Sequence, residues 1–116
     1  MYVDGFLVAV PFAKKAEYAV VAARAAEIFK SHGALRVVEC WGDDMPDGPV
    51  SSFASALKLE HGEVAVFSWI EYPDKETREA CNAAFMADPR TEQDMSIMPF
   101  DSNRIIFGGF SALLDQ

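Results

Sequence analysis

Four runs of the chain are rich in β-branched and aromatic residues and predict β-strands. The predicted strands cover residues 2–11, 34–43, 63–72 and 104–114. In each run, apolar side chains occupy both odd and even positions. Because alternate residues of a strand point to opposite faces of a sheet, this pattern is typical of a sheet that is buried on both faces.

Two longer segments predict amphipathic helices. From Lys14 to His32, apolar residues recur every three or four positions and form one face, with Gly33 as the C-terminal cap. A second helix is predicted from the N-cap Asp74 to about Asp88, where Pro89 ends it.

Three other segments are less regular. Residues 51–59 predict either a short helix capped by Ser52 or a short strand. Residues 90–103 predict a long connection that packs against the rest of the protein, since it carries several apolar side chains. Gly108 and Gly109, within the last strand, predict a bulge or a close approach of another part of the chain.

The order strand, helix, strand, strand, helix, strand predicts an α+β protein with a ferredoxin-like βαββαβ fold. Right-handed crossovers place both helices on one face of a four-stranded antiparallel sheet. The other face then needs a cover of its own, because the strands are apolar on both sides. A second copy of the chain is the simplest cover, so we expect a homodimer whose two sheets form a dimeric α/β barrel. The 116 residues are expected to form a single domain, residues 1–116.

Charge and composition narrow the range of partners. Ten basic and 18 acidic residues give a formal net charge of −8, which disfavours nucleic acid and anionic membrane surfaces as partners. The N-terminus lacks the features of a signal peptide, and no run approaches the ~20 apolar residues that span a bilayer. We therefore expect a cytoplasmic protein, in which Cys40 and Cys81 are buried free thiols.

Short motifs along the whole chain resemble one protein family. In chain order they are YVDGF (2–6), VECW followed by an acidic pair (38–44), PDG (46–48), FSWI (67–70), MADPR (86–90), MPFD (98–101), Arg104 and GGF (108–110). In these motifs the chain resembles the YbaA-like bacterial proteins, domain of unknown function family 1428. The resemblance implies membership of the dimeric α/β-barrel superfamily, in agreement with the dimer expected from the strands. It implies no particular activity.

Carboxylates within apolar strands are the candidate catalytic groups. Glu39 and Asp4 each interrupt a hydrophobic strand, and a buried carboxylate needs a partner. Two interpretations are open: a structural ion pair with Arg36 or Arg104, and a pocket acid or base whose pKa is raised. The acidic residues near Asp43 are better explained as a solvated turn than as a cation site.

A ligand pocket between the sheet and the helices is a further hypothesis. Trp41 and Trp69 lie on strands that the fold can make neighbours, and they are either core residues or walls of such a pocket. Met98 and Phe100 would close the pocket as a lid. The predicted ligand-binding set is Trp41, Trp69, Asp43, Met98, Phe100 and Arg104.

Two functions from different classes remain. His32 and His61 lie at element ends without metal spacing, and no phosphate loop, nucleophile elbow or zinc-protease motif is present. We therefore expect no metal and no cofactor. The first hypothesis is a homodimer that binds a small molecule without catalysis. The alternative is an enzyme like the cofactor-independent monooxygenases or isomerases of the same superfamily, with Glu39 or Asp4 as the base beside the tryptophans. Haem binding is a weaker variant of this alternative, because neither histidine is placed in the middle of a helix, where a proximal ligand would be convenient.

Overall fold

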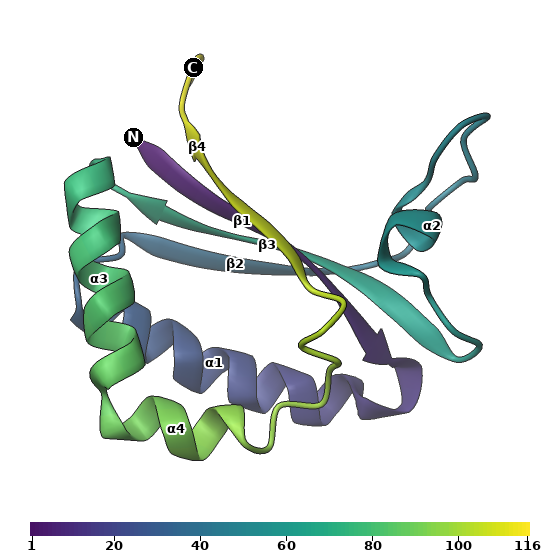
Figure 1. Ribbon diagram of the computed structural model, residues 1–116, viewed down its shortest axis with the longest axis horizontal. Helices are drawn as coiled ribbons and strands as arrows, with labels where there is room; N and C mark the ends of the chain where they lie inside the picture. Colours follow the sequence, from purple (N-terminus) through teal and green to yellow (C-terminus); the bar gives the residue numbers. More distant parts are fainter.

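The computed structural model describes residues 1–116 as a four-stranded sheet with helices (Figure 1). In chain order the elements are β1 (Tyr2–Pro11), the 3-10 turn η1 (Phe12–Lys14), α1 (Lys15–Ser31), β2 (Arg36–Trp41), α2 (Phe53–Leu57), β3 (Glu63–Tyr72), α3 (Lys75–Ala87), α4 (Pro89–Met95) and β4 (Ile106–Ser111). The sheet has the order β2-β3-β1-β4, with every neighbouring pair antiparallel. This is the ferredoxin-like α+β arrangement that the order of predicted elements indicated.

Helices α1, α3 and α4 lie on one face of the sheet (Figure 1). On this covered face the sheet and the helices form two buried clusters: Val8, Val10, Tyr18, Ala22 and Val66 in one, and Ala34, Ile70, Tyr72 and Cys81 in the other. The strand residues of both clusters on β1 and β3 are even-numbered, as the two-residue repeat of a strand requires. None of the helices is both long enough and apolar enough to cross a membrane.

The two central strands have the predicted bounds, whereas the two edge strands are shorter than predicted. β2 ends at Trp41 rather than near residue 43, and β4 covers Ile106–Ser111 rather than 104–114. A central strand is held by hydrogen bonds on both sides and an edge strand on one side only, so its ends leave the sheet more readily. Gly108 and Gly109 interrupt no pairing. A Cβ atom at Gly109 would collide with the Tyr2 side chain, so the close approach is confirmed and the bulge is wrong.

The segment after α3 contains a helix that the sequence did not predict. Pro89 ends α3 but is also the first residue of α4, so residues 90–103 are not one long connection. Proline suits the first position of a helix, and the Asp88 carboxylate caps α4 by accepting from the Arg90 backbone N–H at 2.9 Å. Asp88 also lies 2.9 Å from His32 Nε2 at the end of α1. One carboxylate therefore joins α1 to the junction of α3 and α4.

Helix α2 lies at one end of the face opposite α1, α3 and α4, which we call the open face. The Ser52 hydroxyl accepts from the Ser55 backbone N–H at 3.0 Å and caps α2, so the helix alternative for residues 51–59 is confirmed. Phe53 of α2 lines a small cavity together with Leu7 and Phe67, which point away from the covered face. The α2 segment thus covers one end of the open face only.

Much of the rest of the open face is apolar and accessible to solvent. Its side chains include Phe110, Phe67 and Ile106, with exposed fractions of 63%, 47% and 41%. Cys40, directly opposite Phe67 in the β2–β3 pairing, is also exposed. The prediction that Cys40 is buried is therefore wrong, because its position in β2 points away from the helices. Cys81 is buried on the covered face as predicted, and both thiols are free.

Candidate functional site: a cavity between sheet and helices

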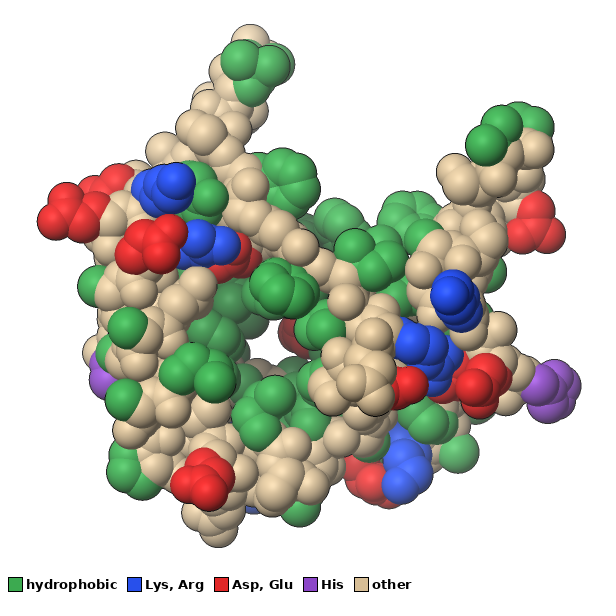
Figure 2. Space-filling view, in the orientation of Figure 1, with side chains coloured by type: hydrophobic (Ala, Val, Ile, Leu, Met, Phe, Trp, Pro, Cys, Tyr) green, Lys and Arg blue, Asp and Glu red, His purple; other side chains and the backbone are tan.

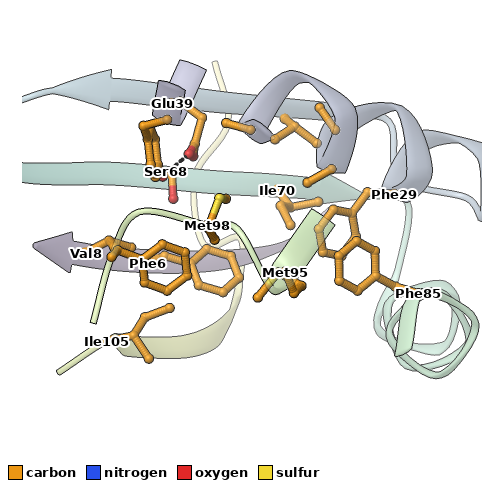
Figure 3. Close-up of a pocket in the computed structure, with 16 residues that line it drawn as sticks. Phe6, Val8, Phe29, Glu39, Ser68, Ile70, Phe85, Met95, Met98 and Ile105 are labelled. Carbon is orange, nitrogen blue, oxygen red and sulfur yellow. Dashed lines mark hydrogen bonds between the residues drawn. The ribbon is translucent and has the colours of Figure 1, made fainter. Parts of the chain in front are cut away.

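A cavity of about 180 Å³, called here the central cavity, lies between the covered face of the sheet and the helices (Figure 3). Fourteen of its 16 lining residues are hydrophobic: Phe6, Val8, Tyr18, Ala22, Ala25, Ala26, Phe29, Val37, Ile70, Phe85, Met95, Met98, Phe100 and Ile105. The two others are Glu39 and Ser68. Figure 2 shows an opening in the middle of the molecule, ringed mostly by hydrophobic side chains.

Small side chains on α1 create this space. Ala22, Ala25 and Ala26 face the sheet at positions where longer side chains would fill the gap. At one end, the rings of Phe29 and Phe85 stack with centroids 3.9 Å apart and close the gap between α1 and α3 (Figure 3). The small residues of α1 therefore leave room against the sheet, and the Phe29–Phe85 stack closes one end of that space.

The polar groups of the central cavity gather around Glu39. Glu39 lies on β2 directly opposite Ser68 of β3, and the two side chains approach each other (Figure 3). The Tyr18 hydroxyl, from α1, donates a hydrogen bond to Glu39 Oε1. The carboxylate remains accessible to solvent through the cavity, but protein atoms surround it closely.

This environment shifts the proton affinity of both partners. Desolvation raises the pKa of Glu39, while the hydroxyls of Tyr18 and Ser68 favour the ionised form and oppose part of that rise. Burial and the neighbouring carboxylate raise the pKa of Tyr18 well above its usual value. The result is a carboxyl group with raised basicity beside a hydroxyl that keeps its proton.

A second cavity, of about 360 Å³, adjoins the first on the β2 side of α1. Five residues line both cavities: Tyr18, Ala22, Ala26, Val37 and Glu39. Trp41 lines this second cavity but not the central one, and the Lys15 ammonium lies 5.4 Å from the centroid of its ring. The Glu39–Tyr18 pair therefore stands between an apolar space and a more polar one.

The side of the central cavity nearest α4 is formed by Met95, Met98, Phe100 and Ile105, which we call the roof. Met98 and Phe100 therefore lie at the cavity, where the sequence placed a lid. Arg104 itself lies outside the lining. Its guanidinium donates to both Glu63 carboxylate oxygens at 2.7 and 2.6 Å, to Asp101 at 3.0 Å and to the Lys58 carbonyl at 3.0 Å. Arg104 anchors the roof to β3 instead of facing a ligand.

Asp4 is placed in an ion pair and not in the cavity. Arg78, from α3, donates three hydrogen bonds of 2.7 to 3.1 Å to its carboxylate. The Asp4 side chain is 5% exposed and that of Arg78 is 17% exposed. Of the partners considered from sequence, Arg36 forms an ion pair with Glu71 at 3.7 Å and Arg104 donates hydrogen bonds to Glu63. The expected partners were wrong because α3 brings Arg78 over β1, a contact that sequence distance does not reveal.

Two other members of the predicted ligand-binding set lie away from the central cavity. Trp69 is directly opposite Val38 on the open face, and its indole N–H donates to Glu71 at 2.9 Å. Trp41 and Trp69 therefore do not wall one pocket, because they point to opposite faces of the sheet. Asp43 lines a separate cavity of about 190 Å³ near α2. No three His, Cys, Asp or Glu side chains converge as a metal site.

Tyr18 and Ser68 are the site residues that sequence reasoning missed. Tyr18 belongs to the apolar face that the sequence predicts for residues 14–32, and it is buried against the sheet as such a face requires. The signal for its second role was Glu39, a carboxylate in an apolar strand that needs a donor. Ser68 gave a weaker signal, as a hydroxyl at a helix-facing position of the central strand β3.

The sequence matches one family over most of its length. The model of the family described as a protein of unknown function (DUF1428) matches residues 1–102. The chain belongs to this family. The uncharacterised protein YbaA of Escherichia coli K12 is 55% identical over 115 residues, which cover 99% of this chain and 98% of YbaA. YbaA of Shigella flexneri shows the same identity and coverage. The resemblance inferred from the motifs is confirmed.

Two solved structures share the fold of this DUF1428 protein at low sequence identity. A dimeric ferredoxin-like protein from an uncultured marine organism has a TM-score of 0.64 and 8% identity, and the match covers 100% of this chain and 98% of that one. An uncharacterised NIPSNAP domain protein from Burkholderia xenovorans has a TM-score of 0.65 and 18% identity, with both chains covered completely. At these identities the likeness confirms the ferredoxin-like fold alone.

Proposed function

We propose that this DUF1428 protein binds a small, largely apolar organic molecule in the central cavity. The observation that carries the proposal is a cavity of about 180 Å³ with apolar walls and one cluster of polar groups, formed by Glu39, Tyr18 and Ser68. Ligand sites commonly combine hydrophobic walls with a few polar groups that fix orientation. An engineered apolar cavity of about 150 Å³ binds benzene. The space here suits one substituted ring or a short branched chain.

Methionine methyl groups offer a direct test. The chain has five methionines, of which Met95 and Met98 line the central cavity. With methyl-labelled methionine, titration by benzyl alcohol should shift the NMR signals of these two and leave Met86, which is exposed on α3, unchanged. If the Met95 and Met98 signals do not shift, or shift no more than the Met86 signal, binding in this cavity is refuted.

The proposal includes a homodimer formed through the open face. Support comes from the apolar residues left accessible there, and from a neighbour of the same fold that is described as dimeric. Burial of two such faces against each other removes a hydrophobic surface from water. A cytoplasmic location is part of the same proposal and suits two cysteines that form no disulfide.

The dimer is tested by one open-face substitution with a matched control. Phe110 on β4 and Phe12 in η1 are 63% and 65% exposed, but only Phe110 lies on the open face. Sedimentation at micromolar concentration should show a dimer for the wild type and for Phe12→Glu, and a monomer for Phe110→Glu. A wild-type monomer would remove this part of the proposal.

A second candidate function is proton-transfer catalysis, in line with the monooxygenase or isomerase alternative. It is supported by Glu39, whose pKa is raised by desolvation at the wall of a cavity. A carboxylate of raised basicity is suited to remove a proton from a carbon next to a carbonyl. Deuterium exchange into cyclohexanone in D₂O, followed by NMR, should be faster with the wild type than with Glu39→Gln. Equal rates would exclude Glu39 as a base for this class of substrate.

A further inference from the structure

Glu39 lines the central cavity without a basic partner, and it is more exposed to solvent than the enclosed carboxylates that are held in ion pairs. The carboxylates with side chains 5–21% exposed each lie within 4 Å of an arginine: Asp4 with Arg78, Asp88 with Arg90, Glu63 with Arg104, Asp94 with Arg24 and Glu71 with Arg36. Glu39 has the neutral hydroxyl of Tyr18 instead. The basic side chain that lines the neighbouring cavity, Lys15, lies over Trp41. The polar end of the site therefore presents a carboxylate that no basic side chain of the protein occupies.

The central cavity has aromatic walls that suit a cation, with Tyr18 and Phe100 near the carboxylate and the stacked Phe29–Phe85 pair at the other end. Five aromatic side chains line the central cavity: Phe6, Tyr18, Phe29, Phe85 and Phe100. Ring faces attract ammonium groups, and cages of aromatic residues are a known means of binding them. The net charge of −8 adds a field that draws cations toward the protein and repels anions.

We propose that the central cavity binds small organic amines in their protonated form, with the ammonium group hydrogen-bonded to the Glu39 carboxylate and the apolar part against the aromatic walls. The ligand supplies the positive charge that this carboxylate lacks. Without a ligand, the Tyr18 hydroxyl donates to one oxygen of the Glu39 carboxylate. The ammonium group is a stronger, charged donor and takes the place of this hydroxyl. This inference rests on the proposed function, the binding of a small molecule in the same cavity.

Three probes that share one ring separate the effect of charge from that of shape. Benzylammonium, benzyl alcohol and benzoate are titrated against the wild type, with the Met95 and Met98 methyl signals as the readout. Hydrogen bonds to a charged donor are about twice as strong as neutral ones, so benzylammonium should bind about tenfold more tightly than benzyl alcohol. Benzoate should not bind, because its carboxylate would meet that of Glu39.

Two variants and one control tie this preference to Glu39. Glu39→Gln should abolish the preference for benzylammonium, whereas Glu27→Gln, an equal change of charge on the exposed side of α1, should keep it. Tyr18→Phe removes the competing hydroxyl and should tighten benzylammonium binding several-fold. It provides a second measurement if Glu39→Gln does not fold.

The outcomes distinguish this inference from the proposal beneath it. If benzyl alcohol binds as tightly as benzylammonium, or if Glu39→Gln keeps the preference, the inference is overturned while the cavity remains a binding site. Weaker benzylammonium binding by Tyr18→Phe would overturn it equally. If none of the three probes shifts the Met95 and Met98 signals, both the inference and the proposed function fail.

Discussion

Replacing Arg78 by Met should destabilise the protein more than replacing Asp4 by Leu, and replacing both should cost less than either change alone. Loss of one partner from a buried ion pair costs about 3–5 kcal/mol, because the remaining charge has no compensation. Arg78→Met leaves a carboxylate that is only 5% exposed, so this full range applies. Asp4→Leu leaves an arginine that is 17% exposed and still bonded to Glu79 at 2.8 Å, so we expect about 2–3 kcal/mol. The double variant replaces the pair by apolar groups and should lie within about 2 kcal/mol of the wild type.

Thermal unfolding at constant protein concentration measures these differences. For a chain of this size, about 1 kcal/mol corresponds to about 4 °C, so Arg78→Met should lower Tm by about 12–20 °C. The control is Arg36→Met, since Arg36 is 66% exposed and lies 3.7 Å from Glu71. Such exposed pairs contribute about 0–1 kcal/mol. A cost for Arg78→Met no greater than for Arg36→Met would refute the structural role of this pair and reopen the catalytic interpretation of Asp4.

Three further outcomes are expected. Ala26→Leu should fill the central cavity and abolish the shifts of the cavity methionine signals by benzyl alcohol, with little change in Tm; retained shifts would place binding elsewhere. Arg104 holds the pKa of Glu63 at about 2, below the usual 4.5, so this pair stabilises the fold above pH 4.5 and loses its effect as pH falls toward 2. The free energy of unfolding in urea should therefore fall less between pH 5 and 2.5 for Arg104→Met than for the wild type. The same fall in both proteins would contradict a stabilising Arg104–Glu63 pair. Tyr18→Phe should raise the pKa of Glu39 further, because the hydroxyl lowers it; carboxyl NMR titration would show this, and no change would argue against the Tyr18–Glu39 bond.

Most of the fold could be predicted from local patterns. The central strands β1 and β3 gave strong signals because most of their residues are hydrophobic and because Pro11 and Pro73 bound them. α4 was missed because its sequence, PRTEQDM, has no apolar face of its own. Its stability comes from the Asp88 cap and from packing on α1. Neither produces a periodic pattern of apolar residues in the sequence.

The site could be predicted only in part, because it depends on which face each strand presents. An isolated acid in an apolar strand identified Glu39, and the apolar connection identified Met98 and Phe100. Strands that are apolar on both sides gave no sign of which side meets the helices, so Trp69 was placed with Trp41 although they point to opposite faces. The hydrogen-bond partners of Asp4 and Glu39 come from α3 and α1. They can be identified only when it is known how these helices cross the sheet.

The roof has a consequence for how relatives of this protein can diverge. Three of its four residues, Met95, Met98 and Phe100, lie between two fixed points, Asp88 at the start of α4 and Arg104 before β4. The floor of the cavity is part of the folding core, whereas Met98 and Phe100 of the roof pack against that core and are only half-buried. Substitutions there can remodel the cavity while the sheet and Glu39 stay in place. Exchange of residues 95–103 between family members should transfer the preference for ligand size. The preference for the ligand's polar group, which is set by Glu39, should stay unchanged.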